Sequence, residues 1–76
     1  MTSKFKVGQE VELNFCEGGG VILKVSSYKD NKKEIDREIM ESGWEQQTFL
    51  TKEELIWYLI DCEEGEIWTD EEEIGE

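Results

Sequence analysis

The carboxylates are the side chains of this chain that are best suited to chemistry, and they are concentrated near its end. Residues 61–76 carry nine acidic side chains and no basic one, whereas residues 1–60 carry 11 acidic and eight basic ones. The last 16 residues therefore hold −9 of the formal net charge of −12. Clustered carboxylates can serve general acid–base catalysis, hold a divalent cation or attract a basic protein.

Catalysis and metal binding fit the sequence poorly. The chain has no histidine, on which acid–base chemistry near neutral pH commonly relies. A calcium loop with Gly65 at its sixth position would need Ile60 as its first ligand, which fails. Cys16 and Cys62 lack the third and fourth soft ligands of a zinc site. We therefore predict no enzyme activity, no cofactor and no metal site.

The two cysteines are expected to be reduced, half-buried core residues, because no secretory signal precedes them. A disulfide between Cys16 and Cys62 is the alternative if their strands are neighbours. The glycine run at 18–20 lacks both the following Lys-Ser/Thr and the helix start of a phosphate-binding loop. It is predicted to be a turn instead.

The charge and the apolar runs also bear on partners and location. A net charge of −12 repels phosphates, and the lysines are scattered, so direct nucleic-acid binding is not expected. The longest apolar run, Leu55–Ile60, has six residues, far short of the ~20 needed to span a bilayer. Residues 1–6 are not followed by an apolar signal segment, which favours a cytoplasmic address.

A chain of 76 residues allows one small domain, 1–76. The apolar residues are mainly Ile, Val, Leu and aromatics, with no Ala and no Pro, which favours β-structure. Within 7–15, Val11, Leu13 and Phe15 alternate with polar residues, as in a half-buried strand. A second strand over 21–25 would form a hairpin with it around the glycine turn.

The middle of the chain predicts a surface helix, or a solvated loop, inserted at about 30–42. Asp30 could cap its start, Ile35, Ile39 and Met40 would share one face, and Gly43 could end it. Arg37 is spaced for ion pairs with Glu34 and Glu41. The secondary structure of residues 44–54 is ambiguous. The capping box at 51–54 either forms one helical turn or is a coincidence of sequence.

The C-terminal region predicts a strand at 55–60 that is buried on both faces, followed by a hairpin. A three-residue loop, 63–65, would set Ile60 opposite Trp68 and Leu59 opposite Thr69. The second capping box, 69–72, predicts a short helical turn, after which Ile74 returns to the core.

The order of these features resembles the small SH3-like β-barrels. The resemblance rests on Lys6-Val7-Gly8 before Val11-Glu-Leu13, and on the Glu-Gly-Glu turn, Trp68 and the run 70–74. It covers residues 5–25 and 55–75, and many proteins of this kind are encoded by bacteria and their phages. The implied fold is mainly β (α+β), a partly open barrel, and no site residue carries over.

Two binding functions follow from the sequence. The acidic segment could mimic nucleic acid and occupy the basic surface of a nucleic-acid-handling protein, as a phage or mobile-element inhibitor would. Alternatively, Tyr28, Trp44, Tyr58 and Trp57 could form an SH3-like peptide groove, or the domain could be a structural or oligomerisation module, monomeric or dimeric. The predicted partner-binding residues are Glu63, Glu64, Glu66, Asp70, Glu71, Glu72, Glu73, Trp44 and Tyr58.

Overall fold

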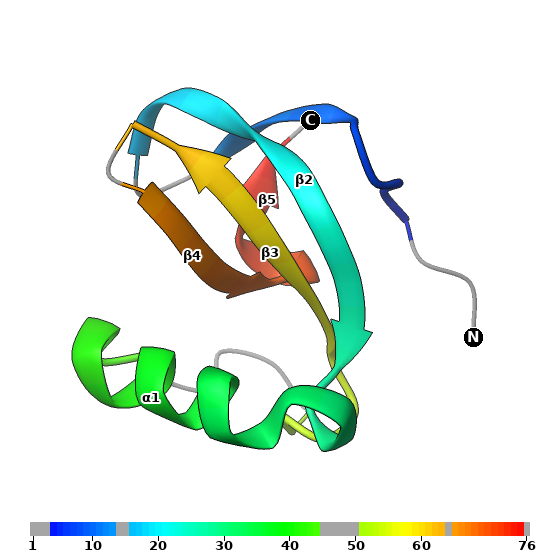
Figure 1. The fold of residues 1–76 in the computed structure, drawn as a ribbon, viewed down its shortest axis with the longest axis vertical. Coiled ribbons are helices and arrows are strands. Elements are labelled where there is room, and N and C mark those ends of the chain that lie inside the picture. Colours follow the sequence, from blue (N-terminus) through cyan, green and yellow to red (C-terminus); the bar gives the residue numbers. More distant parts are fainter. Residues whose placement is uncertain (1–3, 14–15, 45–50, 64, 76) are drawn as a thin grey trace.

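One antiparallel sheet organises the chain in the computed structural model, which describes residues 4–13, 16–44, 51–63 and 65–75. The strands lie in the order β4-β3-β2-β1-β5. In these ranges β4 and β5 are the edge strands, so the sheet is open, and it curls until β5 lies behind β3 (Figure 1). The elements are β1 (Glu10–Leu13), β2 (Cys16–Ser27), η1 (Lys29–Asn31), α1 (Lys32–Ser42), β3 (Ile56–Cys62), β4 (Gly65–Asp70), η2 (Glu71–Glu73) and β5 (Ile74–Gly75).

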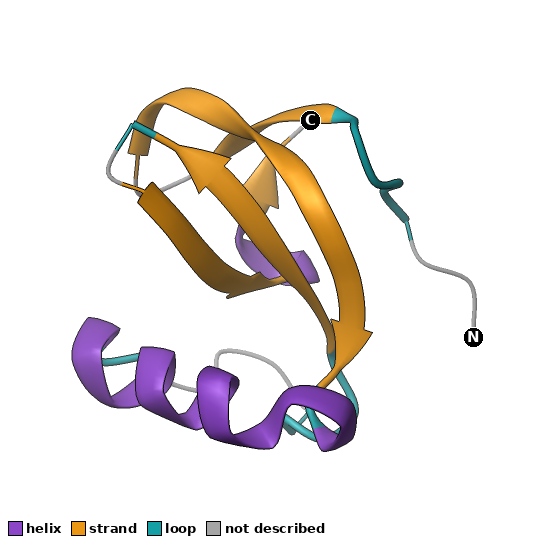
Figure 2. Ribbon diagram, in the orientation of Figure 1, coloured by secondary structure: helices purple, strands orange, loops and turns teal. Residues whose placement is uncertain are grey.

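This arrangement confirms a mainly β, α+β fold with a helix inserted between strands (Figure 2). The helix prediction is confirmed over the loop alternative. None of the helices in the described ranges is suited to cross a bilayer, since even α1 has only 11 residues and most of them are charged.

The predicted double burial of the 55–60 segment is confirmed, because β3 has apolar clusters on both faces. Tyr58 and Ile60 point into an inner cluster, and Trp57 points into an outer cluster on the opposite face. This alternation is the two-residue period of a strand. The inner cluster is Phe5, Val11, Leu13, Ile22, Tyr58, Ile60 and Ile74, and the outer cluster is Tyr28, Ile35, Leu55, Trp57 and Trp68.

The glycine run does not form the predicted turn, because it lies inside β2. A Cβ on Gly19 would collide with the carbonyl oxygen of Val11, and one on Gly20 would lie 2.5 Å from Ile60 Cγ2. The glycines therefore allow β1 and β3 to approach β2 closely. The link between β1 and β2 falls at residues 14–15, outside the described residues, as does Phe15.

The ends and faces of α1 differ in part from the prediction. Gly43 ends the helix in a left-handed conformation, with its N–H donating to Ile39 O at 3.1 Å, as predicted. Asp30 does not cap it, because η1 precedes it and Asn31 takes the cap position. Met40 is 86% exposed, since five residues of helix turn it about 140° from the buried Ile35.

Side chains hold α1 against the segment before β3. The Tyr28 hydroxyl donates to Asp36 Oδ1 at 2.6 Å, and Lys52 Nζ donates to the same oxygen at 3.2 Å. Lys52 Nζ also lies 4.7 Å from the Tyr28 ring centroid. Thr51 and Glu54 form the single capped turn that was one of the two predicted alternatives, with Thr51 Oγ1 donating to Glu54 Oε1 at 3.0 Å.

The predicted register of the last hairpin is wrong by one residue. Ile60 pairs with Ile67 and Leu59 with Trp68, because Cys62 pairs with Gly65, so Gly65 belongs to β4 and not to the loop. This register directs Ile67 toward the inner cluster and Trp68 into the outer one. At the outer edge of β4, Glu38 Oε1 of α1 accepts the Trp68 N–H at 3.3 Å, so the helix covers part of this edge.

Candidate functional site

The predicted acidic segment divides into residues with structural contacts and residues exposed to solvent. Asp70 is only 2% exposed, and Glu71 and Glu73 are half-buried. Glu64 lies outside the described residues. Among the residues of this segment that the structure describes, the exposed carboxylates are those of Asp61, Glu63, Glu66 and Glu72.

Asp70 is an anchor of the fold. Its Oδ1 accepts the backbone N–H groups of Glu72 at 2.8 Å and Glu73 at 3.1 Å, which caps η2. Its Oδ2 accepts the indole N–H of Trp44 at 2.5 Å, across 26 residues of chain. These contacts occupy both oxygens of a buried carboxylate, so Asp70 lies inside the fold and not on the exposed acidic surface that the sequence predicted.

The aromatic platform expected for peptide binding is not formed either. Tyr58 and Trp57 are buried on opposite faces of β3, and Tyr28 is buried beneath α1. Trp44 is half-buried and packs on Trp57, with ring centroids 5.5 Å apart. The Tyr58 hydroxyl does not face solvent, because it donates to Glu71 Oε2 at 2.6 Å.

This burial gives Tyr58 an unusual titration. Burial and the bond to the Glu71 carboxylate raise the pKa of Tyr58 to about 12, and the bond to Asp36 raises the pKa of Tyr28. Since an unfolded tyrosine ionises near 10, the folded state holds its proton longer. The stability from Tyr58 is therefore complete below pH ~10 and declines as the pH rises to about 12.

We expect tyrosinate absorbance to develop late in an alkaline titration of the folded protein, and Tyr58→Phe to remove its last phase. The same protein in urea should ionise both tyrosines near pH 10. Ionisation of both tyrosines near pH 10 in the folded protein would contradict the buried Tyr58–Glu71 contact.

The strand register assembles a different acidic site on the outer face of the sheet. Glu10 of β1 pairs with Val21 of β2, Val21 pairs with Asp61 of β3, and Asp61 pairs with Glu66 of β4. Paired residues point to the same side of a sheet, and all three carboxylates are exposed. We call Glu10, Asp61 and Glu66 the acidic row.

The acidic row places like charges in direct opposition. Asp61 and Glu66 are cross-strand partners, and such pairs of equal charge destabilise a sheet. Glu10 lies two strands from Asp61, about 10 Å away at the usual strand spacing. Glu66 was among the predicted contacts, but Glu10 and Asp61 were missed. Only the register joins them to Glu66, and no sequence spacing reveals it.

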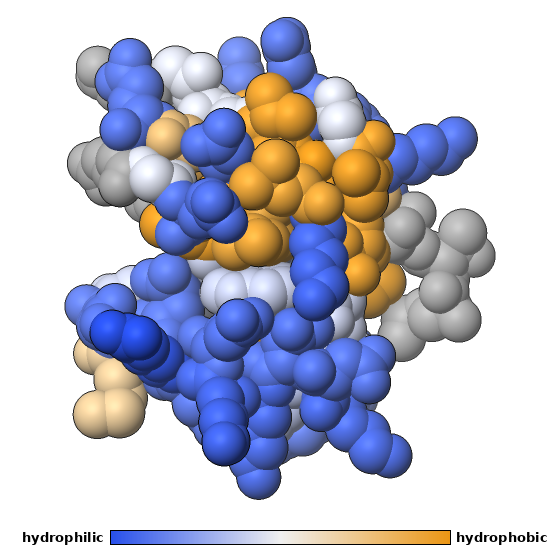
Figure 3. All heavy atoms as spheres, viewed as in Figure 1, coloured by the Kyte–Doolittle hydropathy of each residue, from blue (hydrophilic) through white to orange (hydrophobic). Residues whose placement is uncertain are grey.

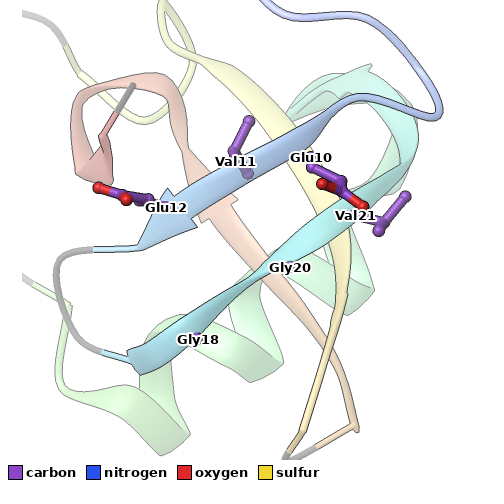
Figure 4. A pocket seen from close by; sticks show the side chains of 6 residues that line it. All are labelled: Glu10, Val11, Glu12, Gly18, Gly20 and Val21. Carbon is purple, nitrogen blue, oxygen red and sulfur yellow. The ribbon is translucent and has the colours of Figure 1, made fainter.

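A shallow hollow of about 460 Å³ lies beside the acidic row, where β1 meets β2. Figure 4 shows Glu10 and Val21 side by side at one end of it, and bare strand at Gly18 and Gly20. Both glycines contribute bare backbone to its lining, and a Cβ added at Gly18 would meet no atom within 4 Å. Its lining residues are Glu10, Val11, Glu12, Gly18, Gly20 and Val21.

The remaining chemistry in the described ranges is limited. No three cysteine, aspartate or glutamate side chains there converge as they would around a metal ion. Cys62 is a free thiol whose Sγ donates to Gly65 O at 3.2 Å. No protein family, no curated protein and no solved structure matches this chain.

Proposed function

We propose that the protein is a non-enzymatic, acidic binding module that occupies a basic surface of another protein. The observation that carries this proposal is the acidic row, where Asp61 and Glu66 oppose each other across two strands. A sheet keeps such a pair against its own stability where the charge serves another purpose. Carboxylates held on a rigid sheet attract a basic partner quickly and in a salt-dependent way.

The form of this function that we favour is charge mimicry of nucleic acid toward a host or defence protein, as in a cytoplasmic inhibitor from a phage or mobile element. We also propose that the fold is an SH3-like, partly open barrel. In support, η2 lies between β4 and β5, where the resemblance expects a helical turn. The aromatic peptide groove is not proposed, because its tyrosines and Trp57 are buried.

Neutralising the acidic row tests the function. The triple variant Glu10→Gln, Asp61→Asn, Glu66→Gln should lose the basic proteins that the tagged wild type retains from a bacterial lysate at low salt. Retained proteins are identified by mass spectrometry, and the wild type should release them at high salt. Removing the opposed charges should also stabilise the fold by roughly 0.2–1 kcal/mol, measured by urea unfolding.

The matched control removes three charges elsewhere. The control variant is Asp30→Asn, Glu34→Gln, Glu53→Gln, and it has the same net charge as the acidic-row variant. These three residues are exposed on or near α1. The control variant should retain the partner as the wild type does. Equal loss in both triple variants would mean that only net charge matters, and retention by the acidic-row variant at every salt concentration would refute the proposal.

A further inference from the structure

α1 covers only part of the outer sheet face. Trp57 and Trp68 are buried under the helix, and Leu59 packs at their side. Further along the same face, Val21 is half-buried and Asp61 and Glu66 are exposed. Figure 3 shows apolar surface gathered over β2 and β3, above the hydrophilic surface of α1. This uncovered part of the face has no partner within the described residues.

A β-bulge increases the apolar surface there. Ile22 pairs with Ile60 and Lys24 with Leu59, so Leu23 is the extra residue in β2. Because two residues of β2 then oppose one of β3, Leu23 is displaced from regular pairing and is 40% exposed. The turn at 6–9 is held to β2 by Gly8 N–H donating to Ile22 O at 2.7 Å, and its Val7 is 63% exposed.

Negative charge borders this apolar surface on one side. Glu10 and Asp61 flank Val21 directly, and Glu12 lies on the wall of the hollow. The described ion pairs, Arg37–Glu41 and Lys52–Asp36, involve α1 instead. An apolar centre beside carboxylates is complementary to a basic segment that carries an apolar side chain, and the hollow has room for the stem of a lysine or arginine.

We propose that this face docks a segment of a protein partner in which basic side chains flank an apolar one. The apolar side chain packs on Val21 and Leu23, and the basic ones lie along the acidic row and in the hollow. A second copy of this chain is a poor occupant, because each copy carries −12 and the acidic rows would repel. This proposal rests on the proposed function and adds an apolar anchor to it.

The test titrates the labelled protein with two peptides of equal charge, Lys-Leu-Lys-Leu-Lys and Lys-Ser-Lys-Ser-Lys, followed by amide chemical shifts. We expect the leucine peptide to bind about tenfold more tightly, with shifts centred on Val21, Leu23 and Asp61. Leu23→Ser should reduce its affinity to that of the serine peptide. Val7→Ser, outside the strands, should weaken it in the same direction and guards against misfolding of Leu23→Ser.

Met40→Ser is the control, because it removes an apolar side chain that is even more exposed than Leu23, from the far side of α1, and it should leave both affinities unchanged. Equal binding of the two peptides, with loss on neutralising the acidic row, would overturn the apolar anchor and leave the proposed function standing. Leucine-specific binding that the neutralised variant retains would overturn the proposed function, and with it the contact of basic side chains with the acidic row, and would leave only the apolar contact standing. Binding of neither peptide, or a dimer that Leu23→Ser dissociates, would overturn this proposal.

Discussion

Trp57→Ala is expected to leave the protein largely unfolded at room temperature. Trp57 is almost fully buried at the centre of the outer cluster, and its indole N–H donates to Lys52 O at 2.9 Å. Replacing a buried tryptophan by alanine costs about 3–5 kcal/mol. A domain of this size has a total stability of roughly 3–5 kcal/mol, so the loss equals the whole.

Far-UV circular dichroism and urea unfolding measure this effect. Trp57→Phe keeps part of the buried surface and should still unfold cooperatively, with a loss of about 1–3 kcal/mol that can be quantified. Met40→Ala, on the exposed face of α1, should change the stability by less than about 0.5 kcal/mol. A cooperative transition in Trp57→Ala, within 1 kcal/mol of the wild type, would contradict the packing of α1 on β3 through this residue.

Period-2 patterns and turn residues predicted the parts of the fold that depend on local chemistry. Alternation at Val11 and Leu13 placed both in the core, and the apolar run at 55–60 became a strand buried on both faces. Gly43 ended α1 where a left-handed residue was expected. These features follow from contacts within a few residues, which is the range that a sequence pattern reports.

The errors arose where a distant partner decides between local alternatives. Gly19 and Gly20 have turn chemistry, but the close approach of β1 and β3 requires them within β2. The last hairpin shifted by one residue because Ile67 packs against the inner cluster and Trp68 in the outer one, and the predicted register would have exchanged their faces. Loop length alone could not show this, because Gly65 fits both as the left-handed residue of a three-residue loop and as the first residue of β4, where it has a positive φ.

The candidate site was the least predictable part for the same reason. The density of charge at the end of the chain was visible, and Glu66 was selected from it. The partners of Glu66 on the sheet, however, are Asp61 and, across Val21, Glu10, which belongs to the other end of the chain. Asp70 and Tyr58, which the sequence placed at the exposed site, are buried. A core accepts their polar atoms because hydrogen bonds satisfy them.

Asp70→Ala is the second large effect that we expect, a loss of about 2–3 kcal/mol in the free energy of unfolding. The cap on η2 contributes about 1 kcal/mol, and the Trp44 N–H left without its acceptor adds a further 1–2 kcal/mol. Asp70→Asn should lose less, because its amide oxygen still caps η2. Its NH₂ group, however, faces another donor, the Trp44 indole.

Urea unfolding of Asp70→Ala, Asp70→Asn and Glu72→Gln checks this order. Glu72 is exposed and adjacent, so its neutralisation should change the stability by less than about 0.5 kcal/mol. Equal, small effects at both positions would show that Asp70 is only a surface charge. If the effects differ as expected, neutralising residues 70–73 together would destabilise the fold and would weaken binding for that reason. A test of charge must therefore act on the acidic row, whose exposed carboxylates cap no helix and accept no buried N–H group in the part of the chain that the structure describes.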